Sequence, residues 1–193
     1  MARAPENAVR IRLTGRGGQG IMLAGAVLAE AAMRDGRHVS QIQEYGPEAR
    51  LGATRADVIV SAAEIAYPEV DRADVLLGLS RDGALRYLRS LAEDGIAILD
   101  DRIDLPEEST RQTARIMRLP LVRTAREIGD EITTNMVGLG ALCAVSRAVT
   151  PESLEAALRA RAKAEFAEAN VRALAAGQEL GRRAAGEVAQ TVP

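Results

Sequence analysis

Six residues of the sequence, GRGGQG at positions 15–20, have the composition of a phosphate-binding turn. Gly15, Gly17 and Gly20 match the G-x-G-x-x-G pattern, and the flanking residues favour a strand before them and a helix after them. Glycine allows positive φ angles and a close backbone approach, and the free N–H groups at a helix N-terminus attract anions. The turn therefore predicts either an anion-binding site or a tight connection that uses glycine for packing.

NAD or FAD binding is one interpretation of this turn, because Glu44 lies near the position of a ribose-binding acid. The residues after Glu44, YGPEAR, oppose it, since they form a constrained and charged loop where an adenine pocket needs open space. No second half of the chain resembles a substrate domain. His38 is expected at the start of a strand, the wrong end for proton transfer, and is interpreted as a surface or packing residue. A free-standing NAD(P)-binding oxidoreductase is thus the alternative function.

The scarce residue types exclude several kinds of site. The 193-residue chain has one cysteine and one histidine, so we expect no internal disulfide and no zinc or iron–sulfur site. A net charge of -2, with three tyrosines and one phenylalanine, argues against nucleic-acid binding. We recognise neither a signal peptide nor a membrane span, so a cytoplasmic location without membrane contact is expected. Cys143 lies in an apolar pattern and is expected to be buried rather than nucleophilic.

Strand and helix patterns alternate over the first two thirds of the chain. Helices are expected at residues 21–34 and 82–95, and a loop at residues 45–54. Residues 9–43 are typical of a β-loop-α-β unit. The alternation predicts an α/β fold, a Rossmann-like layered domain with a mostly parallel sheet. Apolar runs predict its strands at residues 9–13, 38–43, 55–62, 73–80, 96–100 and 114–120, the last at an edge.

The last third of the sequence predicts helical additions to this sheet. Residues 135–149 form an apolar helix that is expected to lie against the sheet, and a long helical pattern covers residues 164–185. Thr150 and Pro151 have the residue types of an N-cap and a first helical position. We predict a single domain over residues 1–193, with an α/β sheet core at 9–134, C-terminal helices at 135–185, and frayed ends at 1–8 and 186–193.

Several segments together resemble one known family. They are GRGGQGIMLAGAVLAEAA, EYGPEARLGATRADVIVS, ADVLLGLS and NMVGLGAL, with Asn170 and ALAAGQELG further along the chain. This set resembles the gamma subunit of the 2-oxoacid:ferredoxin oxidoreductases, which include the pyruvate, 2-oxoglutarate and indolepyruvate enzymes. The resemblance extends from Val9 to about Gly181, and the glycine turn followed by YGPEAR is its most specific part. The family usually has Arg-Gly-Gly where this sequence has Arg50, Leu51 and Gly52.

The resemblance implies a role inside a larger enzyme. Members of the family oxidatively decarboxylate a 2-oxoacid such as pyruvate or 2-oxoglutarate to an acyl-coenzyme A, with ferredoxin as the electron acceptor. They use thiamine diphosphate, magnesium and [4Fe–4S] clusters. A cluster needs about four cysteines, and neither RDGAL nor GDEITTN matches the Gly-Asp-Gly and asparagine pattern of a thiamine diphosphate site. We therefore expect no cofactor in this chain and assign them to alpha and beta, and in some enzymes delta, partner subunits.

Assembly of the complex and binding of the co-substrate coenzyme A are the two roles left for this chain, and they can coexist. The pyrophosphate of coenzyme A suits a glycine turn at a helix N-terminus. Arg16 and Arg50 can add charge-assisted hydrogen bonds. In a second interpretation, Arg16, Glu48 and Arg50 instead form ion pairs with a partner subunit. In a third, the chain is a scaffold whose turn binds nothing. We expect no catalytic residue and no metal ligand, and the predicted binding residues are Gly15, Arg16, Gly17, Gly18, Gln19, Gly20 and Arg50.

Overall fold

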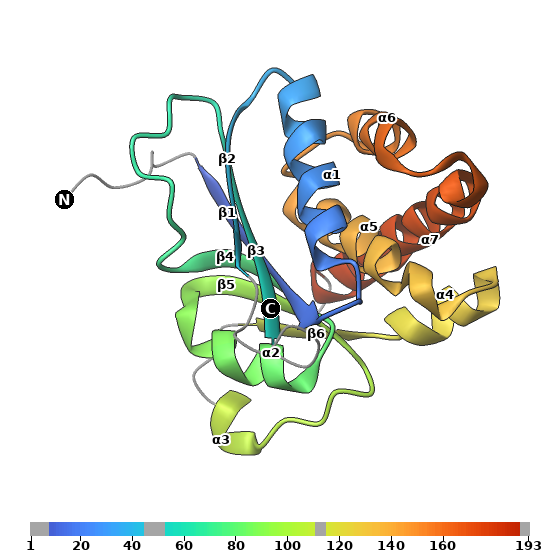
Figure 1. Cartoon of the computed structure of the whole chain (residues 1–193). Coiled ribbons are helices and arrows are strands. Elements are labelled where there is room, and N and C mark those ends of the chain that lie inside the picture. Colours follow the sequence, from blue (N-terminus) through green and yellow to red (C-terminus); the bar gives the residue numbers. More distant parts are fainter. Residues whose placement is uncertain (1–7, 45–52, 111–114, 190–193) are drawn as a thin grey trace.

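A six-stranded sheet with the strand order β2-β3-β1-β4-β5-β6 forms the centre of the structure (Figure 1). The computed structural model describes residues 8–44, 53–110 and 115–189. β6 lies at one edge of the sheet, as its sequence predicts. The strands are β1 (Val9–Arg16), β2 (His38–Glu44), β3 (Ala53–Ser61), β4 (Ala73–Gly78), β5 (Leu91–Asp100) and β6 (Arg115–Leu119).

The sheet is mostly parallel, which confirms the predicted α/β fold class. β1, β4, β5 and β6 pair in parallel, whereas β3 pairs antiparallel with both β1 and β2. β2 consequently runs in the same direction as β1, but β3 lies between them. The first β-α-β unit is therefore present, with its two strands separated by a third.

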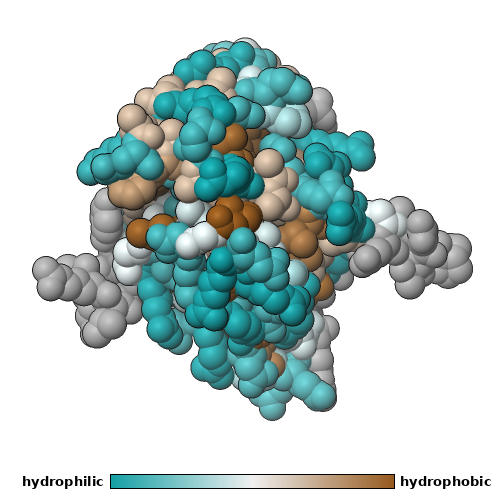
Figure 2. All heavy atoms as spheres, turned by 90° about the vertical axis from the view of Figure 1, so that its right-hand side faces the viewer, coloured by the Kyte–Doolittle hydropathy of each residue, from teal (hydrophilic) through white to brown (hydrophobic). Residues whose placement is uncertain are grey.

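Helices cover both faces of the sheet (Figure 1). α1 and α5 pack on one face, with α6 and α7 outside them, and α2 packs on the other. The outer surface of the α4, α6 and α7 side is largely hydrophilic, with apolar patches near its middle (Figure 2). The helices are α1 (Ile21–Arg34), α2 (Arg81–Tyr87), α3 (Glu107–Thr110), α4 (Leu121–Ile128), α5 (Thr134–Ser146), α6 (Pro151–Arg161) and α7 (Ala164–Ala189), with the short 3-10 helices η1 (Leu88–Ser90) and η2 (Glu131–Thr133).

Alternation along the strands divides the core in two. Ile11 and Leu13 of β1 belong to the cluster that contains the buried residues of α1, α5 and α6, whereas Ile59 and Leu76 belong to the cluster around α2. Successive side chains of a strand point to opposite faces, so β3, β4 and β5 each supply both clusters, whereas β1 supplies only the first. None of the helices within the described ranges is both long and apolar enough to span a bilayer.

The limits of two predicted elements are wrong, although the elements themselves exist as α2 and β3. Residues 91–95 belong to β5 rather than to a helix, because Leu91 pairs with Ala73 while Ile96 already pairs with Val75. This irregularity lets the segment pair with β4 while Leu91 fills the α2 core, and pairing overrides its helical composition. Residues 53–54 belong to β3 rather than to a loop, because they continue the ladder opposite Gly15 and Arg16.

The predicted ends of the chain fall partly outside the described residues. Where they are described, Ala8 is buried and α7 continues to Ala189. Thr150 caps α6 as predicted, since its hydroxyl oxygen accepts a hydrogen bond from the Ser153 N–H at 3.3 Å. The apolar helix predicted at residues 135–149 is α5, which lies between the sheet and α7.

Candidate functional site

The glycine turn lies where the chain changes faces of the sheet. β1 leads through the turn into α1 on one face, while its parallel neighbour β4 leads into α2 on the other face. The Leu79 N–H donates to the Thr14 carbonyl oxygen at 2.9 Å, which joins the ends of the two strands. In open α/β sheets, ligands bind in the crevice at such a switch point, outside the carboxyl ends of the strands.

Gln19 fixes the conformation of the turn. Its backbone N–H donates to the Arg16 carbonyl oxygen at 3.1 Å, and its Oε1 accepts from the Arg16 N–H at 2.6 Å. Its Nε2 donates to the Leu79 carbonyl oxygen at 3.2 Å. Gly18 and Gly20 have φ angles of 90° and 70°, which glycine adopts without strain. The turn is thus held to the end of β4 by one side chain.

The N-terminus of α1 begins without a side-chain cap. Gly20 occupies the N-cap position, and the first turn of α1 contains no acidic residue. Among the described residues, α2, α6 and the 3-10 helix η2 do have side-chain caps: Ser80 accepts from Gly83, Thr150 from Ser153, and Asp130 from Ile132. The first N–H groups of α1 and its helix dipole therefore face the crevice without a protein anion to neutralise them.

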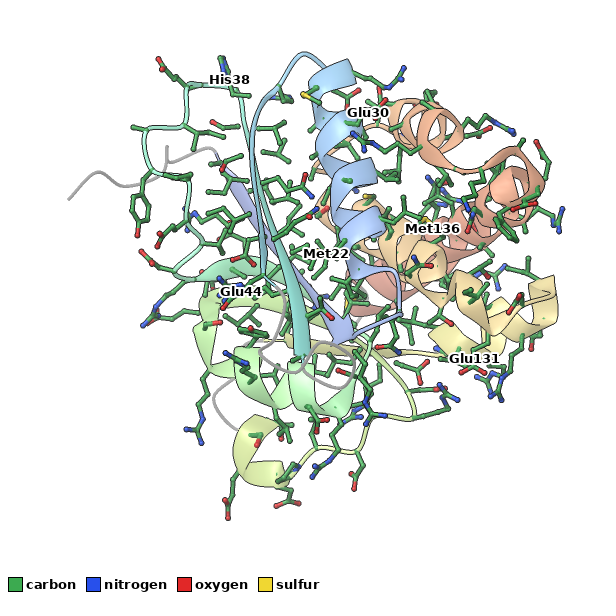
Figure 3. The ribbon with its side chains drawn as sticks, viewed as in Figure 1. Met22, Glu30, His38, Glu44, Glu131 and Met136 are labelled. Carbon is green, nitrogen blue, oxygen red and sulfur yellow. The ribbon has the colours of Figure 1, made fainter. Side chains whose placement is uncertain are left out.

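Asn135 joins this N-terminus to α5, and the sequence did not predict its role. Its side chain is buried, with 5% of the residue exposed, and its Nδ2 donates to the Gly20 carbonyl oxygen at 3.1 Å. The two helix starts can be found in Figure 3 by the labels of Met22 in α1 and Met136 in α5. The sequence feature that could have indicated this role is a polar residue at the start of an otherwise apolar helix.

A small pocket of about 180 Å³ adjoins the turn, lined by Gly18, Gln19, Val122, Glu131, Ile132 and Thr134. Glu131 is paired with Arg126 at 2.6 Å, so its negative charge is balanced. Ile132 is 70% exposed, which is unusual for a large apolar side chain. The pocket thus offers backbone groups of the turn and an apolar rim.

Arg16 lies at the exposed end of β1, and its side chain makes few contacts. Its nearest carboxylate is Asp82, at 3.7 Å, and the two side chains are 59% and 62% exposed. Such a solvent-exposed pair contributes little to stability. The guanidinium is therefore available to an anion or a partner at the crevice.

The structure brings six of the seven predicted binding residues together. Gly15 and Arg16 are the last residues of β1, and Gly17, Gly18, Gln19 and Gly20 form the turn. Arg50, with Glu48 and Leu51, lies outside the described residues. The described residues hold no group of three or more histidine, cysteine, aspartate or glutamate side chains that suits a metal ion.

The arrangement around Glu44 does not match a dinucleotide site. Glu44 is bound to Arg55, with 2.7 Å between Oε2 and Nη2. Because β3 separates β2 from β1, the end of β2 lies two strand spacings, about 10 Å, from the glycine turn. His38 is exposed at the opposite end of β2, as predicted (Figure 3). Cys143 is buried, as predicted, and burial raises the pKa of its thiol far above the ordinary value.

A buried ion pair lies in β1 beneath the turn, and it too was not predicted. Arg12 Nε and Nη2 each donate to Asp57 of β3 at 2.8 Å, and both side chains are almost fully buried. Arg12 Nη1 donates to Ser90 Oγ at 2.7 Å, and its guanidinium lies 4.9 Å from the centre of the Tyr87 ring. The network links β1, β3 and the α2 face, which supports the strand that carries the turn.

Fold and site together define an α/β protein with a glycine turn at the switch point of its sheet. Residues 10–180 match the family described as pyruvate ferredoxin/flavodoxin oxidoreductase, and the chain belongs to this family.

Individual relatives are consistent with the gamma-subunit resemblance. The chain is 39% identical to the 2-oxoglutarate synthase subunit KorC of Methanothermobacter marburgensis over 176 residues, which is 88% of this chain and 95% of that protein. It is similar to the crystal structure of a keto/oxoacid ferredoxin oxidoreductase gamma subunit from Geobacter sulfurreducens, with a TM-score of 0.78, 35% identity, and 90% and 98% of the two chains covered. These similarities support the oxidoreductase subunit and not the free-standing NAD(P)-binding enzyme.

The fold also occurs within a longer chain. It matches the 2-oxoglutarate:ferredoxin oxidoreductase from Magnetococcus marinus with a TM-score of 0.82 and 22% identity. The match covers 93% of this chain and 32% of the other. The single domain seen here is therefore one part of a larger polypeptide in that enzyme.

Proposed function

We propose that this chain serves as the gamma subunit of a 2-oxoacid:ferredoxin oxidoreductase and that its glycine turn binds the phosphates of coenzyme A. The observation that carries the proposal is the uncapped N-terminus of α1, which opens at the switch point beside the exposed Arg16. Backbone N–H groups and one guanidinium suit a pyrophosphate. Coenzyme A is bound in the Magnetococcus marinus enzyme, which shares this fold.

The redox chemistry is assigned to other chains. The single cysteine is buried, and the described residues do not provide the ligands of a metal cluster. We therefore place thiamine diphosphate, magnesium and the [4Fe–4S] clusters on alpha and beta partner subunits, with ferredoxin as the electron acceptor of the complex. The purified chain is expected to be free of iron, and 2-oxoacid-dependent reduction of a viologen dye should require the partner subunits. Stoichiometric iron or sulfide in the chain alone would contradict this assignment.

Kinetics of the assembled complex test the coenzyme A site. Arg16→Ala removes one charge-assisted contact, worth roughly 1.5–3 kcal/mol, so the KM for coenzyme A should rise about tenfold or more. The KM for the 2-oxoacid should stay nearly constant. Arg50→Ala, the second arginine indicated by the sequence, should act in the same direction. Arg89→Ala, at an exposed residue of η1, is the control.

The alternative role is an interface with a partner subunit, which the exposed Ile132 beside the turn favours. In that case, Arg16→Ala should weaken the complex on gel filtration, while complexes that stay intact keep their normal KM for coenzyme A. If assembly and coenzyme A kinetics are both unchanged, the turn is a packing element and the proposed site is wrong.

A further inference from the structure

A second cavity, of about 540 Å³, lies far from the glycine turn. It is formed where the C-terminal ends of α1 and α5 meet the N-terminus of α6 and the middle of α7. The 14 residues of α1 separate the two ends, and this length corresponds to about 21 Å. The volume falls within the range typical of small-molecule sites.

Three arginines give this cavity its charge. Arg37, Arg147 and Arg182 all line it. Arg182 is paired with Glu179, at 3.0 Å between Nη2 and Oε2. Within the described part of the chain, neither Arg37 nor Arg147 has an ion pair or a side-chain hydrogen bond. Arg147 therefore has no neutralising partner among these residues, and Arg37 has only the Coulombic attraction of Asp35.

The one carboxylate in the cavity wall is already occupied. Asp35 accepts hydrogen bonds from the Thr150 N–H and hydroxyl at 2.7 Å each, and from the Ser153 hydroxyl at 2.5 Å. Burial alone raises the pKa of Asp35, but the hydrogen bonds from Ser153 and Thr150 and the nearby Arg37 together hold it below its ordinary value. Its ionised oxygens bind α6 to the end of α1, so they do not neutralise Arg147 directly.

Arg147 adopts a backbone conformation that glycine adopts more easily. Its φ and ψ are 53° and 28°, and it is the one non-glycine residue with positive φ among the described residues. The position follows the last residue of α5, where glycine is the usual choice. An arginine there is strained, and its charge interacts favourably with the helix C-terminus. This interaction with the helix C-terminus does not explain why a cavity lies beside Arg147.

We propose that this cavity binds a small organic phosphate. Two guanidinium groups without an ion pair or a side-chain hydrogen bond among the described residues suit a phosphate monoester, whose charge is about -1.5 to -2 at neutral pH. Cys143, Ala148, Val149 and Pro151 supply an apolar part of the wall for the organic group. The proposal is independent of the coenzyme A site.

Isothermal titration of the full chain with adenosine 5′-monophosphate tests it, with adenosine as the uncharged control. A Kd on the order of 100 µM is expected for the phosphate, and no saturable binding for adenosine. Arg37→Ala and Arg147→Gly should each raise the Kd at least tenfold. Arg147→Gly should also keep or raise the melting temperature, because glycine relaxes the left-handed backbone.

Arg16→Ala separates this cavity from the glycine turn, and Arg89→Ala is the surface control. Both variants should leave the affinity for the phosphate unchanged. The proposal is overturned if the phosphate does not bind below about 10 mM, if Arg37→Ala or Arg147→Gly leaves the affinity unaltered, or if Arg16→Ala removes binding. The last result would place the phosphate at the turn.

Discussion

The side-chain amide of Asn135 occupies the space that a Cβ on Gly20 would need. These residues are far apart in the sequence, yet the Asn135 Nδ2 donates to the Gly20 carbonyl oxygen at 3.1 Å. The contact holds the N-termini of α1 and α5 together at the carboxyl end of the sheet. Gly20 is thus required for two reasons, its positive φ and the neighbouring amide.

Replacing Gly20 by alanine should destabilise the fold. The new methyl group meets the Asn135 amide and the backbone is strained at a φ of 70°, so we expect a loss of about 2–4 kcal/mol in the free energy of unfolding. Urea unfolding followed by circular dichroism measures it. Gly186→Ala, at an exposed position of α7 with nothing within 4 Å of its Cβ, should be neutral or stabilising.

The double variant Gly20→Ala/Asn135→Ala separates the two causes. Removal of the amide relieves the overlap but not the backbone strain, so the two losses should be less than additive. Strict additivity would show that the overlap at Asn135 has no part in the effect of Gly20→Ala.

Local patterns account for most of the fold. Residues 21–34 are a helix in both the prediction and the structure. The turn glycines set its first residue, and the Asp35–Gly36 pair sets its last. The position of β3 between β1 and β2 was not predictable in this way, since strand order depends on pairing between distant segments. Residues 91–95 show the same limit, because their pairing with β4 depends on the fold of the whole sheet.

The candidate site was predicted in part for a similar reason. A contiguous motif identified the glycine turn, whereas Asn135 contacts it from α5 and the Arg12–Asp57 pair joins β1 to β3 below it. Nothing in the single sequence connects Arg12 to Asp57, which lie 45 residues apart. Their pairing follows from the antiparallel register, in which Arg12 lies opposite Asp57.

Breaking the buried Arg12–Asp57 pair should be strongly destabilising. Arg12→Met leaves the Asp57 carboxylate buried without its bidentate partner, so we expect a loss of about 3–5 kcal/mol in the free energy of unfolding. Arg126→Met breaks the exposed pair with Glu131 and should cost less than about 1 kcal/mol. If chemical denaturation gives the two variants equal losses in the free energy of unfolding, burial does not strengthen the contribution of the Arg12–Asp57 pair.

The contact between α5 and α7 should tolerate no added side chain. A Cβ on Gly140 would overlap the Leu174 carbonyl oxygen, and one on Gly177 would overlap the Val137 carbonyl oxygen. Because these neighbours are helix backbone and not flexible side chains, Gly177→Ala should lower the free energy of unfolding by about 2–3 kcal/mol. Thermal melting checks this against Gly186→Ala on the same helix, and equal melting temperatures would contradict close packing of the two backbones.

Asp35 should make the junction of α1 and α6 sensitive to acid. Burial opposes its ionisation, but hydrogen bonds from Ser153 and Thr150 lower its pKa in the folded state below the ordinary value. A carboxylate with a lowered folded pKa contributes stability that is fully present above the unfolded pKa, about 3.9, and is lost as the pH falls through the folded pKa. The stabilising contribution should therefore decrease from about pH 5 downward.

Asp35→Asn tests this pH dependence directly. The variant lacks the titrating group, so its free energy of unfolding should fall less steeply than that of the wild type below about pH 5, with parallel curves from pH 6 to pH 8. Glu30→Gln is the matched comparison, because Glu30 also joins α1 to α6 and hydrogen bonding to Arg34 lowers its pKa. If urea unfolding gives the same slope for Asp35→Asn and the wild type between pH 5 and pH 2.5, the Asp35 carboxylate does not govern acid sensitivity at this junction.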